Sequence, residues 1–244
     1  MNTNHVPLTD SQWQRLEIFF SKTSTRGRKR QVSMRQVVDE LLYIVQTGVQ
    51  WRNLRSNIPW QTIYYYFRLY KPILNDILQS IQNEQVNYET TAIDTQSTRV
   101  SNFIHEYKGI DGNKKINGRK RLIWVDSNGL LLNCYVGSAD THDGELGLEV
   151  LYQMSDKIKE VNADHPFGGV FKESAKLFNI KVIVAQKPET SKGFVPQKGR
   201  WQVERSFAWL NHFRRLSKDY EKLPESSAAF IVLAFLQMII NRLR

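Results

Sequence analysis

The stretch RLIWVDSNGLLLNCYVGSA, residues 121–139, limits the possible folds of this chain more than any other feature. Apolar runs flank Asn128 and Gly129, and an Asn-Gly pair between such runs is a strong signal for a β-hairpin. A further β-rich stretch, TTAID at 90–94, precedes the hairpin. We therefore expect a sheet that contains antiparallel strands in this part of the chain.

Helical and strand patterns alternate after the hairpin, and two helices end the chain. We expect helices at 143–156 and 168–178 and strands at 158–164 and 180–188. This order predicts a mixed α/β domain over residues 87–244, with helices packed on a sheet.

The first 86 residues have a different, helical pattern. Thr9 with Gln12 fits the capping box of a helix start, and WQTIYYYFRLY at 60–70 is a tyrosine-rich third helix. The connector KTSTRGRKR, 22–30, carries basic residues and no acid. The pattern indicates a helix-turn-helix-like DNA-binding domain over 1–86. The alternative is a helical bundle whose tyrosines only pack.

The charge balance favours a polyanionic partner. The chain has 34 basic and 24 acidic residues, a formal net charge of +10, which is most often associated with nucleic acid. The alternative is a basic protein that binds no nucleic acid.

The single cysteine and the apolar segments indicate the compartment. Cys134 alone excludes a disulfide framework and a zinc site built from cysteines, and it suits the reducing cytoplasm. The apolar run at 228–240 includes Gln237 and is shorter than the roughly 20 residues that span a membrane, so we expect a buried core helix. The expected localisation is cytoplasmic, without membrane contact.

Three acids are placed where a catalytic site would need them. Asp94 ends the first expected strand, and Asp164 ends the fourth, before a turn into a helix. Glu204 lies in RWQVERSFAWLNHFRR, 200–215, a helix with apolar residues on both flanks that we expect to be well buried. Carboxylates that converge at the end of a sheet could hold two divalent cations, and Mg²⁺ prefers such oxygen ligands.

Each acid also has a structural interpretation. Asp94 could cap a turn, and Asp164 could form an Asx-turn before Pro166. Glu204 could pair with Arg200, four residues earlier on the same helix face. The helix by itself favours this ion pair over a metal ligand.

Several motifs, in order along nearly the whole chain, resemble one family. AIDTQSTR, GRKRLIWVDSNGLLL, ADHPFGG, RWQVERSFAWL and RRLSKDYE are similar to motifs of the DDE transposases of bacterial insertion sequences, of the insertion-sequence-five type in the insertion-sequence-four/five superfamily. LTDSQWQRLEIFF and WQTIYYYFRLY resemble the helical DNA-binding region of that family.

The resemblance implies an RNase H-like catalytic domain with two Mg²⁺ or Mn²⁺ ions held by Asp94, Asp164 and Glu204. It also implies cleavage of DNA strands at the element ends and transfer of the 3′-OH into target DNA. The expected partner is double-stranded DNA with inverted repeats, bound by a homo-oligomer that assembles on it.

Basic and polar residues of four regions are the expected DNA contacts: the connector, the third helix, the basic tract KKINGRKR at 114–121, and the helix that carries Glu204. They are Arg28, Lys29, Arg30, Gln61, Thr62, Tyr65, Arg68, Lys114, Lys115, Arg119, Lys120, Arg121, Arg200 and Arg215. The alternative for the basic tract is a solvated hairpin edge.

Two other functions fit parts of this pattern. The fourth strand carries Glu160 and Asn162 where apolar residues are expected, which leaves open a catalytically decayed transposase or a repressor that only binds DNA. A repair or restriction nuclease on the same core would cut DNA without joining it.

Overall fold

The computed structural model describes residues 5–20, 30–83, 85–184 and 199–242, which fold into two compact units. The first unit comprises Met1–Asn83, His212–Leu216 and Ala229–Arg244, and the second comprises Glu84–Asn211 and Ser217–Ala228. The structure thus differs from the predicted division into 1–86 and 87–244, because two later segments group with the N-terminal helices.

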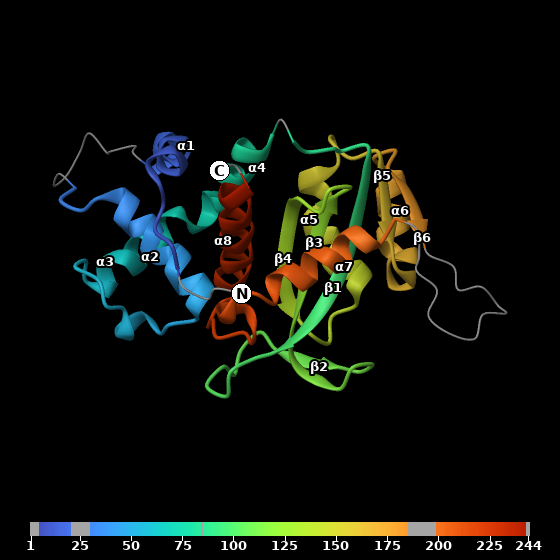
Figure 1. The fold of residues 1–244 in the computed structure, drawn as a ribbon. Helices are drawn as coiled ribbons and strands as arrows, with labels where there is room; N and C mark the ends of the chain where they lie inside the picture. The colour runs from blue at the N-terminus through green and yellow to red at the C-terminus, as the bar shows by residue number, and fades with distance from the viewer. Residues whose placement is uncertain (1–4, 21–29, 84, 185–198, 243–244) are drawn as a thin grey trace. The chain divides into compact units, whose positions relative to one another are not determined.

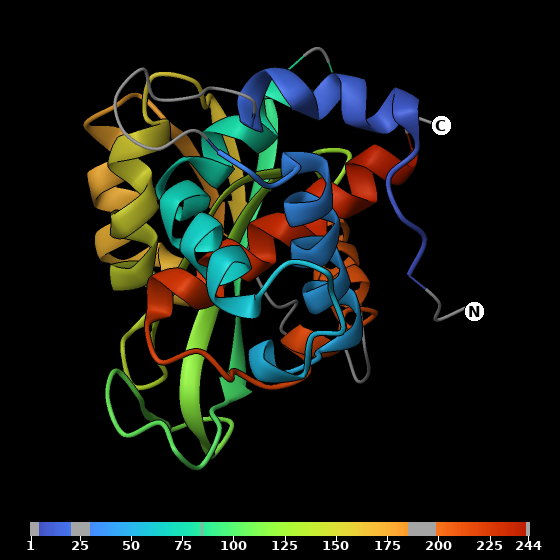
Figure 2. The ribbon, with the colours of Figure 1, turned by 90° about the vertical axis from the view of Figure 1, so that its left-hand side faces the viewer.

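The first unit is helical (Figures 1 and 2). Its elements are α1 (Asp10–Phe20), α2 (Met34–Thr47), η1 (Trp51–Asn53), α3 (Trp60–Tyr70), η2 (Lys71–Ile73), α4 (Leu74–Gln82), η4 (Arg214–Leu216) and most of α8 (Pro224–Arg242). The predicted capping box is formed, since Gln12 Oε1 accepts the Thr9 N–H at 2.9 Å and Thr9 Oγ1 accepts the Gln12 N–H at 3.3 Å. Local sequence signals therefore define the start of α1.

Helix α8 supplies apolar side chains to the core of the first unit. The Phe230 ring lies 5.0 Å from Phe67 and 6.1 Å from Trp51, and Gln12 Nε2 donates to the main-chain oxygen of Ile240 at 3.2 Å. By length and composition α8 could cross a membrane, yet 67% of its apolar window is buried inside the fold. The prediction of a buried core helix is confirmed.

The second unit contains a six-stranded mixed sheet in the order β2-β3-β1-β5-β6, with β4 also paired to β3 (Figure 1). Its elements are β1 (Thr90–Arg99), β2 (Gly109–Asp111), β3 (Ile116–Asp126), β4 (Leu131–Ser138), α5 (Asp143–Met154), β5 (Glu160–Ala163), η3 (His165–Gly168), α6 (Val170–Lys176), β6 (Lys181–Val184) and α7 (Trp201–Leu210). Neighbours among β1, β3 and β4 are antiparallel, whereas β1, β5 and β6 run parallel. This arrangement, with flanking helices, is the predicted RNase H-like α/β fold.

The predicted hairpin is present, and the structure corrects the strand next to it. Gly129 adopts φ 79° between β3 and β4, in the left-handed region that glycine tolerates. Strand β1 continues to Arg99 instead of ending at Asp94, because its second half pairs with residues 118–122 of β3. The short strand β2 has no counterpart among the predicted elements.

Alternation along β1 and β3 separates two faces of the sheet. Ile93, Leu122 and Trp124 pack in one apolar core with residues of α5 and α6. Their sequence neighbours point to the opposite face, across which α7 runs in Figure 1. Asp94 therefore faces α7.

A buried ion pair fixes one end of the sheet. Arg119 on β3 and Asp219 are both 0% exposed, with 3.3 Å between Nη1 and Oδ2. The same guanidinium donates to the main-chain oxygens of Tyr107 at 2.9 Å, Glu221 at 2.7 Å and Lys222 at 2.8 Å. These bonds tie β3 to two irregular segments that are distant in the sequence.

Replacing Arg119 with leucine should lower the free energy of unfolding by about 3–5 kcal/mol, because the buried Asp219 would lose its ion-pair partner. Urea denaturation of the full chain measures this loss. Lys159→Met is the matched control, since it breaks an exposed pair with Glu89 that contributes at most about 1 kcal/mol. Equal unfolding midpoints for the two variants would contradict the assignment.

Candidate active site

Asp94 lies near the middle of β1, with its side chain 18% exposed. Its Oδ1 accepts the main-chain N–H of Thr95 at 2.7 Å. Burial raises the pKa of this carboxyl above its ordinary value, although Arg200 and the Thr95 N–H act in the opposite direction. An ionised Asp94 therefore needs a cation beside it.

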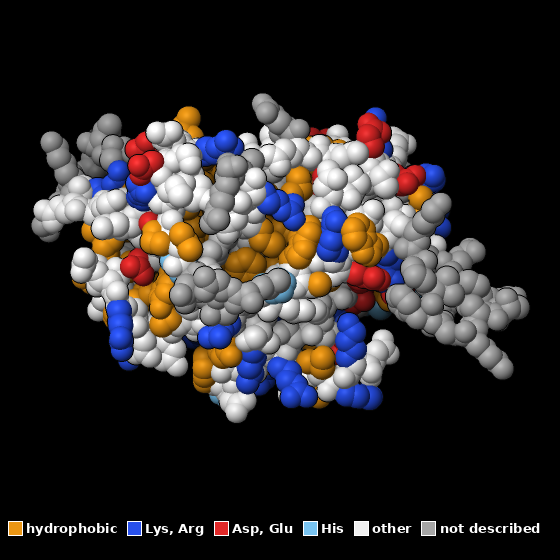
Figure 3. Space-filling model, viewed as in Figure 1, with side chains coloured by type: hydrophobic (Ala, Val, Ile, Leu, Met, Phe, Trp, Pro, Cys, Tyr) orange, Lys and Arg blue, Asp and Glu red, His pale blue; other side chains and the backbone are white. Residues whose placement is uncertain are grey.

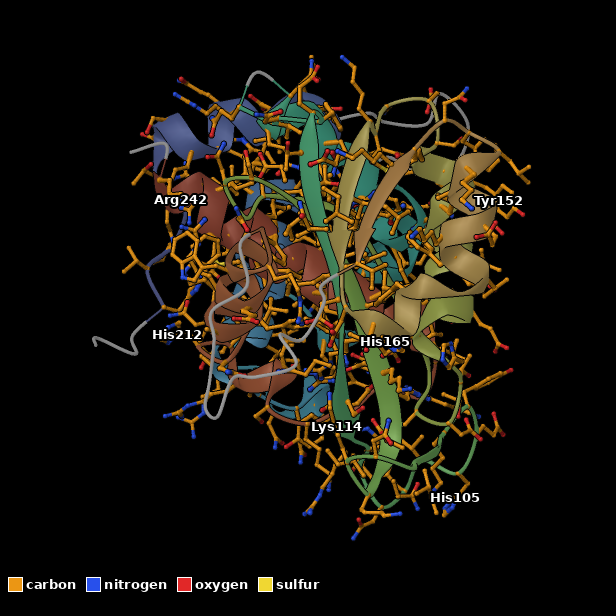
Figure 4. All side chains as sticks on the ribbon, turned by 90° about the vertical axis from the view of Figure 1, so that its right-hand side faces the viewer. His105, Lys114, Tyr152, His165, His212 and Arg242 are labelled. Atoms are coloured by element: carbon orange, nitrogen blue, oxygen red, sulfur yellow. The ribbon has the colours of Figure 1, made fainter. Side chains whose placement is uncertain are left out.

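The parallel pairing of β1 with β5 brings Asp164 next to Asp94. Ile93 pairs with Ala163, so the next residue of each strand continues the same register. Asp164 caps η3, where its Oδ1 accepts the His165 N–H at 2.8 Å, and it is 43% exposed. Figure 4 labels His165, the residue that follows Asp164. The predicted neighbourhood of the two aspartates is thus present.

Arg200 bridges the two aspartates. Its Nη2 lies 3.1 Å from Asp94 Oδ2 and its Nη1 lies 3.4 Å from Asp164 Oδ1, and the side chain is 14% exposed. The ion pairs that the structure describes for Arg200 run to these two carboxylates and not to Glu204. Among the described residues, the partners of Arg200 in these ion pairs are thus the two aspartates, and the alternative pair with Glu204 is not among them.

Gly199 and Asn162 determine where α7 begins. Gly199 adopts φ +90°, and a Cβ atom there would lie 2.5 Å from Asn162 Oδ1. Asn162 Nδ2 in turn donates to the main-chain oxygen of Thr91 on β1 at 3.1 Å. This close contact between glycine and asparagine holds the residue before Arg200 against β5.

The polar residues of β5 thus have partners in the fold. Asn162 bonds to β1, and Glu160 pairs with Lys181 at 2.9 Å on the neighbouring strand β6. Their presence is explained by the sheet and is no sign of a decayed site.

Glu204 is exposed on α7, which corrects the expectation of a helix buried on both flanks. The flank with Val203 and Phe207 is buried. On the other flank, the guanidinium of Arg205 lies 4.1 Å from the Trp201 ring and 4.7 Å from the Trp209 ring. The tryptophans therefore stack on an arginine instead of forming core.

The donor set suits a hard divalent cation, although the carboxylates are not gathered. Among the residues that the structure describes, no three His, Cys, Asp or Glu side chains are close enough to hold a metal ion. Asp94 and Asp164 nevertheless present oxygen donors on either side of one positive charge. Glu204 lies one helical turn beyond Arg200 and offers a third carboxylate.

Three predicted DNA contacts are buried. Arg119 and Arg121 lie inside the second unit, with Arg119 in the ion pair described above. Arg215 is buried in the first unit, where its Nη1 donates to the Val49 oxygen at 3.3 Å and its guanidinium lies 5.1 Å from the Phe230 ring. The structure corrects the prediction of these three as DNA contacts, because their side chains are buried inside their own units.

The other residues of the basic tract differ in exposure. Lys114 and Lys115 are exposed in the turn between β2 and β3, where Figure 4 labels Lys114. Lys120 is mostly buried and pairs with Asp143 at 2.8 Å. Within the basic tract, therefore, Lys114 and Lys115 in the turn are the basic residues whose side chains are exposed and could contact phosphates.

The expected contacts of the first unit lie mainly on its surface. Gln61, Tyr65 and Arg68 are exposed on α3, and Thr62 is half-buried. Arg30 is half-buried and donates to the Phe20 oxygen at 3.2 Å. Arg28 and Lys29 lie outside the described residues.

Replacing Asp94 with asparagine should raise the melting temperature at about pH 7. The folded chain binds the Asp94 proton more tightly than the unfolded chain does, so ionised Asp94 destabilises the fold above its raised pKa. The gain in melting temperature should shrink as the pH falls toward about 3, where Asp94 is protonated in both the folded and the unfolded chain. Thermal unfolding across this pH range measures it.

Asp126→Asn is the control of the same type. Asp126 is buried, and its Oδ1 accepts the N–H groups of Asn128 and Leu130 at 2.8 and 2.7 Å, while Oδ2 accepts that of Asn87 at 3.1 Å. An amide offers only one acceptor oxygen, so this variant should melt at a lower temperature. A lower melting temperature for Asp94→Asn as well would contradict the proposed cost of ionising Asp94.

Comparisons with known proteins identify the family of this chain. Residues 86–239 match the family model described as the transposase DDE domain, and residues 8–72 match that of a putative transposase of the IS4/5 family. A putative transposase for insertion sequence element IS402 from Burkholderia cepacia is 41% identical over 61 residues, which make up 25% of this chain and 29% of that protein.

A solved structure is also similar at low identity. It is the piggyBac transposase in a synaptic complex with hairpin DNA, at 15% identity and a TM-score of 0.34, covering 75% of this chain and 48% of that chain. The chain thus spans less than half the length of either relative. Since the DDE-domain model covers more than half of the sequence, the chain belongs to the DDE transposases of the IS4/5 type.

Proposed function

We propose that this chain cleaves DNA strands at the ends of an insertion sequence and joins the freed 3′-OH to target DNA. One observation carries the proposal: Asp94 and Asp164 lie side by side at neighbouring parallel strands and share one cationic partner. Two Mg²⁺ or Mn²⁺ ions, when bound, would supply charge stabilisation to the attacking and leaving oxygens.

The side chains divide the work at this site. Asp94 provides a carboxylate from β1, Asp164 provides one from the residue that follows β5, and Glu204 provides a third from α7. Arg200 places a guanidinium, whose planar donors match a phosphate, in the same small region. These residues can orient a phosphodiester for direct attack, so the reaction needs no covalent intermediate with the enzyme.

The DNA-binding surface proposed here has two parts. The exposed face of α3 offers Gln61, Tyr65 and Arg68 for base and phosphate contacts. In the second unit, basic side chains gather over β2 in Figure 3, and Lys114 and Lys115 are exposed beside it. We further propose that the protein acts in the cytoplasm as a homo-oligomer assembled on the element ends.

Glu204→Gln and Asp164→Asn should each reduce Mg²⁺-dependent nicking of end-containing DNA by orders of magnitude, while duplex binding persists. Because Glu204 is exposed, its variant should also keep the melting temperature of the unaltered chain. Asp140→Asn, which removes an exposed acid elsewhere in the same unit, is the control and should nick normally. Gel analysis of nicked and joined products provides the measurement.

Two results would overturn the catalytic proposal. One is nicking that survives exhaustive EDTA treatment, and the other is full activity of either acid variant. Nicks without any joined product would instead identify a nuclease.

Arg68→Ala and Lys114→Ala should each reduce the slope of log K against log salt concentration by about one unit, since each would remove one phosphate contact. Lys176→Ala is the control, because Lys176 is exposed on α6 and pairs with Glu173. Its slope should equal that of the unaltered chain. Unchanged slopes for Arg68→Ala and Lys114→Ala would remove these side chains from the DNA surface.

A further inference from the structure

We propose that Arg200 and a divalent cation compete for the same carboxylate pair, so that DNA binding, by drawing Arg200 away, opens the site to the metal. This inference rests on the function proposed above and adds a regulatory step to it. Arg200 is then a positioning residue that guards Asp94 and Asp164 in the DNA-free chain.

The geometry makes the two occupants exclusive. The Nη2 and Nη1 atoms of one guanidinium lie 3.1 and 3.4 Å from an oxygen of Asp94 and of Asp164. Asp94 and Asp164 would also hold the cation, which would then share this small region with the guanidinium charge, and like charges at about 4 Å repel strongly in a partly buried site. Occupation by one therefore disfavours the other.

The carboxylate pair also needs some cation. The carboxyl groups of Asp94 and Asp164 lie on either side of one guanidinium, and the Asp94 side chain is only 18% exposed, so a positive charge between them is favourable. Arg200 supplies that charge in the absence of metal. In the DNA-free chain the Arg200 side chain therefore acts as the cation for this carboxylate pair.

The exchange requires only side-chain rotation. The Arg200 oxygen accepts the N–H groups of Val203 at 3.1 Å and Glu204 at 3.3 Å, so it takes part in the first turn of α7. Gly199, packed on Asn162, holds the preceding residue in place. The backbone is thus fixed, while the long arginine side chain can turn to another anion.

A DNA phosphate is such an anion. Guanidinium groups bind phosphate as well as carboxylate through paired N–H donors. When Arg200 turns to a phosphate, Asp94 and Asp164 are left to the metal. DNA and metal should therefore strengthen each other's binding, because coupling between two ligands is reciprocal.

The first experiment measures Mn²⁺ binding to the full chain without DNA, from the loss of the free Mn²⁺ signal in electron paramagnetic resonance. Arg200→Gln should bind Mn²⁺ at least about tenfold more tightly than the unaltered chain. Adding Asp94→Asn to Arg200→Gln should abolish this binding.

Arg99→Gln is the matched control, since it removes one exposed positive charge from the same strand. Arg99 is five residues from Asp94, about 16 Å along β1, which exceeds the screening length of about 10 Å at 0.1 M salt. Its Mn²⁺ affinity should change by less than about twofold.

Arg200→Lys provides a second variant that can be tested if Arg200→Gln does not fold. Lysine keeps the charge but presents one ammonium, which cannot donate to both carboxylates as a planar fork does. Its Mn²⁺ affinity should lie between those of the unaltered chain and Arg200→Gln. Thermal unfolding shows whether each variant is folded, and a folded Arg200→Lys that follows no such order contradicts the proposal.

The second experiment repeats the titration with end-containing duplex DNA. DNA should tighten Mn²⁺ binding to the unaltered chain by about tenfold and should have little effect on Arg200→Gln, in which the competitor is already gone. Equal or weaker Mn²⁺ binding by Arg200→Gln in the first experiment overturns the inference. If the unaltered chain still nicks DNA with Mg²⁺, the proposed function stands without it; if nicking and Asp94-dependent Mn²⁺ binding are both absent, both proposals fall.

Discussion

Two carboxyl groups side by side at neighbouring parallel strands impose the main constraint on this molecule. The register of β1 and β5 places Asp94 beside Asp164 whether or not a cation is present. The pair must then be neutralised, and the fold does so with Arg200, whose position depends on the contact of Gly199 with Asn162. The site is thus costly to the fold, as expected where function and stability conflict.

Some of the excess positive charge lies inside the fold, where it interacts with other buried groups and is not exposed to a partner. Arg119 neutralises Asp219 and satisfies main-chain oxygens in the interior, and Arg215 covers an aromatic ring in the first unit. A net charge of +10 therefore overstates the basic surface that phosphates can reach. Among the described residues that we propose as DNA contacts, the exposed basic ones are Arg68 on α3 and Lys114 and Lys115 in the turn between β2 and β3.

Local patterns predicted the elements well and their environments less well. The Asn-Gly hairpin, the capping box at Thr9 and the mixed α/β class follow from local patterns, and so they could be predicted, whereas the RNase H-like fold was predicted from the resemblance of several motifs to a family. The burial of Arg119 depends on Asp219, a hundred positions away, and the grouping of α8 with the first unit depends on contacts such as Phe67 with Phe230. Such distant pairs leave no periodic signal. The polar Asn162 in a strand was a usable signal, because buried polar groups need partners.

The most direct test of the central claim is the location of Mn²⁺ by its anomalous X-ray scattering in crystals of the chain with an element-end duplex, with Glu204→Gln to stop cleavage. We expect an anomalous peak in contact with both Asp94 and Asp164, with the Arg200 guanidinium moved from these carboxylates to a DNA phosphate. A structure in which Arg200 still bridges the two aspartates, with Mn²⁺ bound elsewhere on the DNA-bound chain, would contradict it.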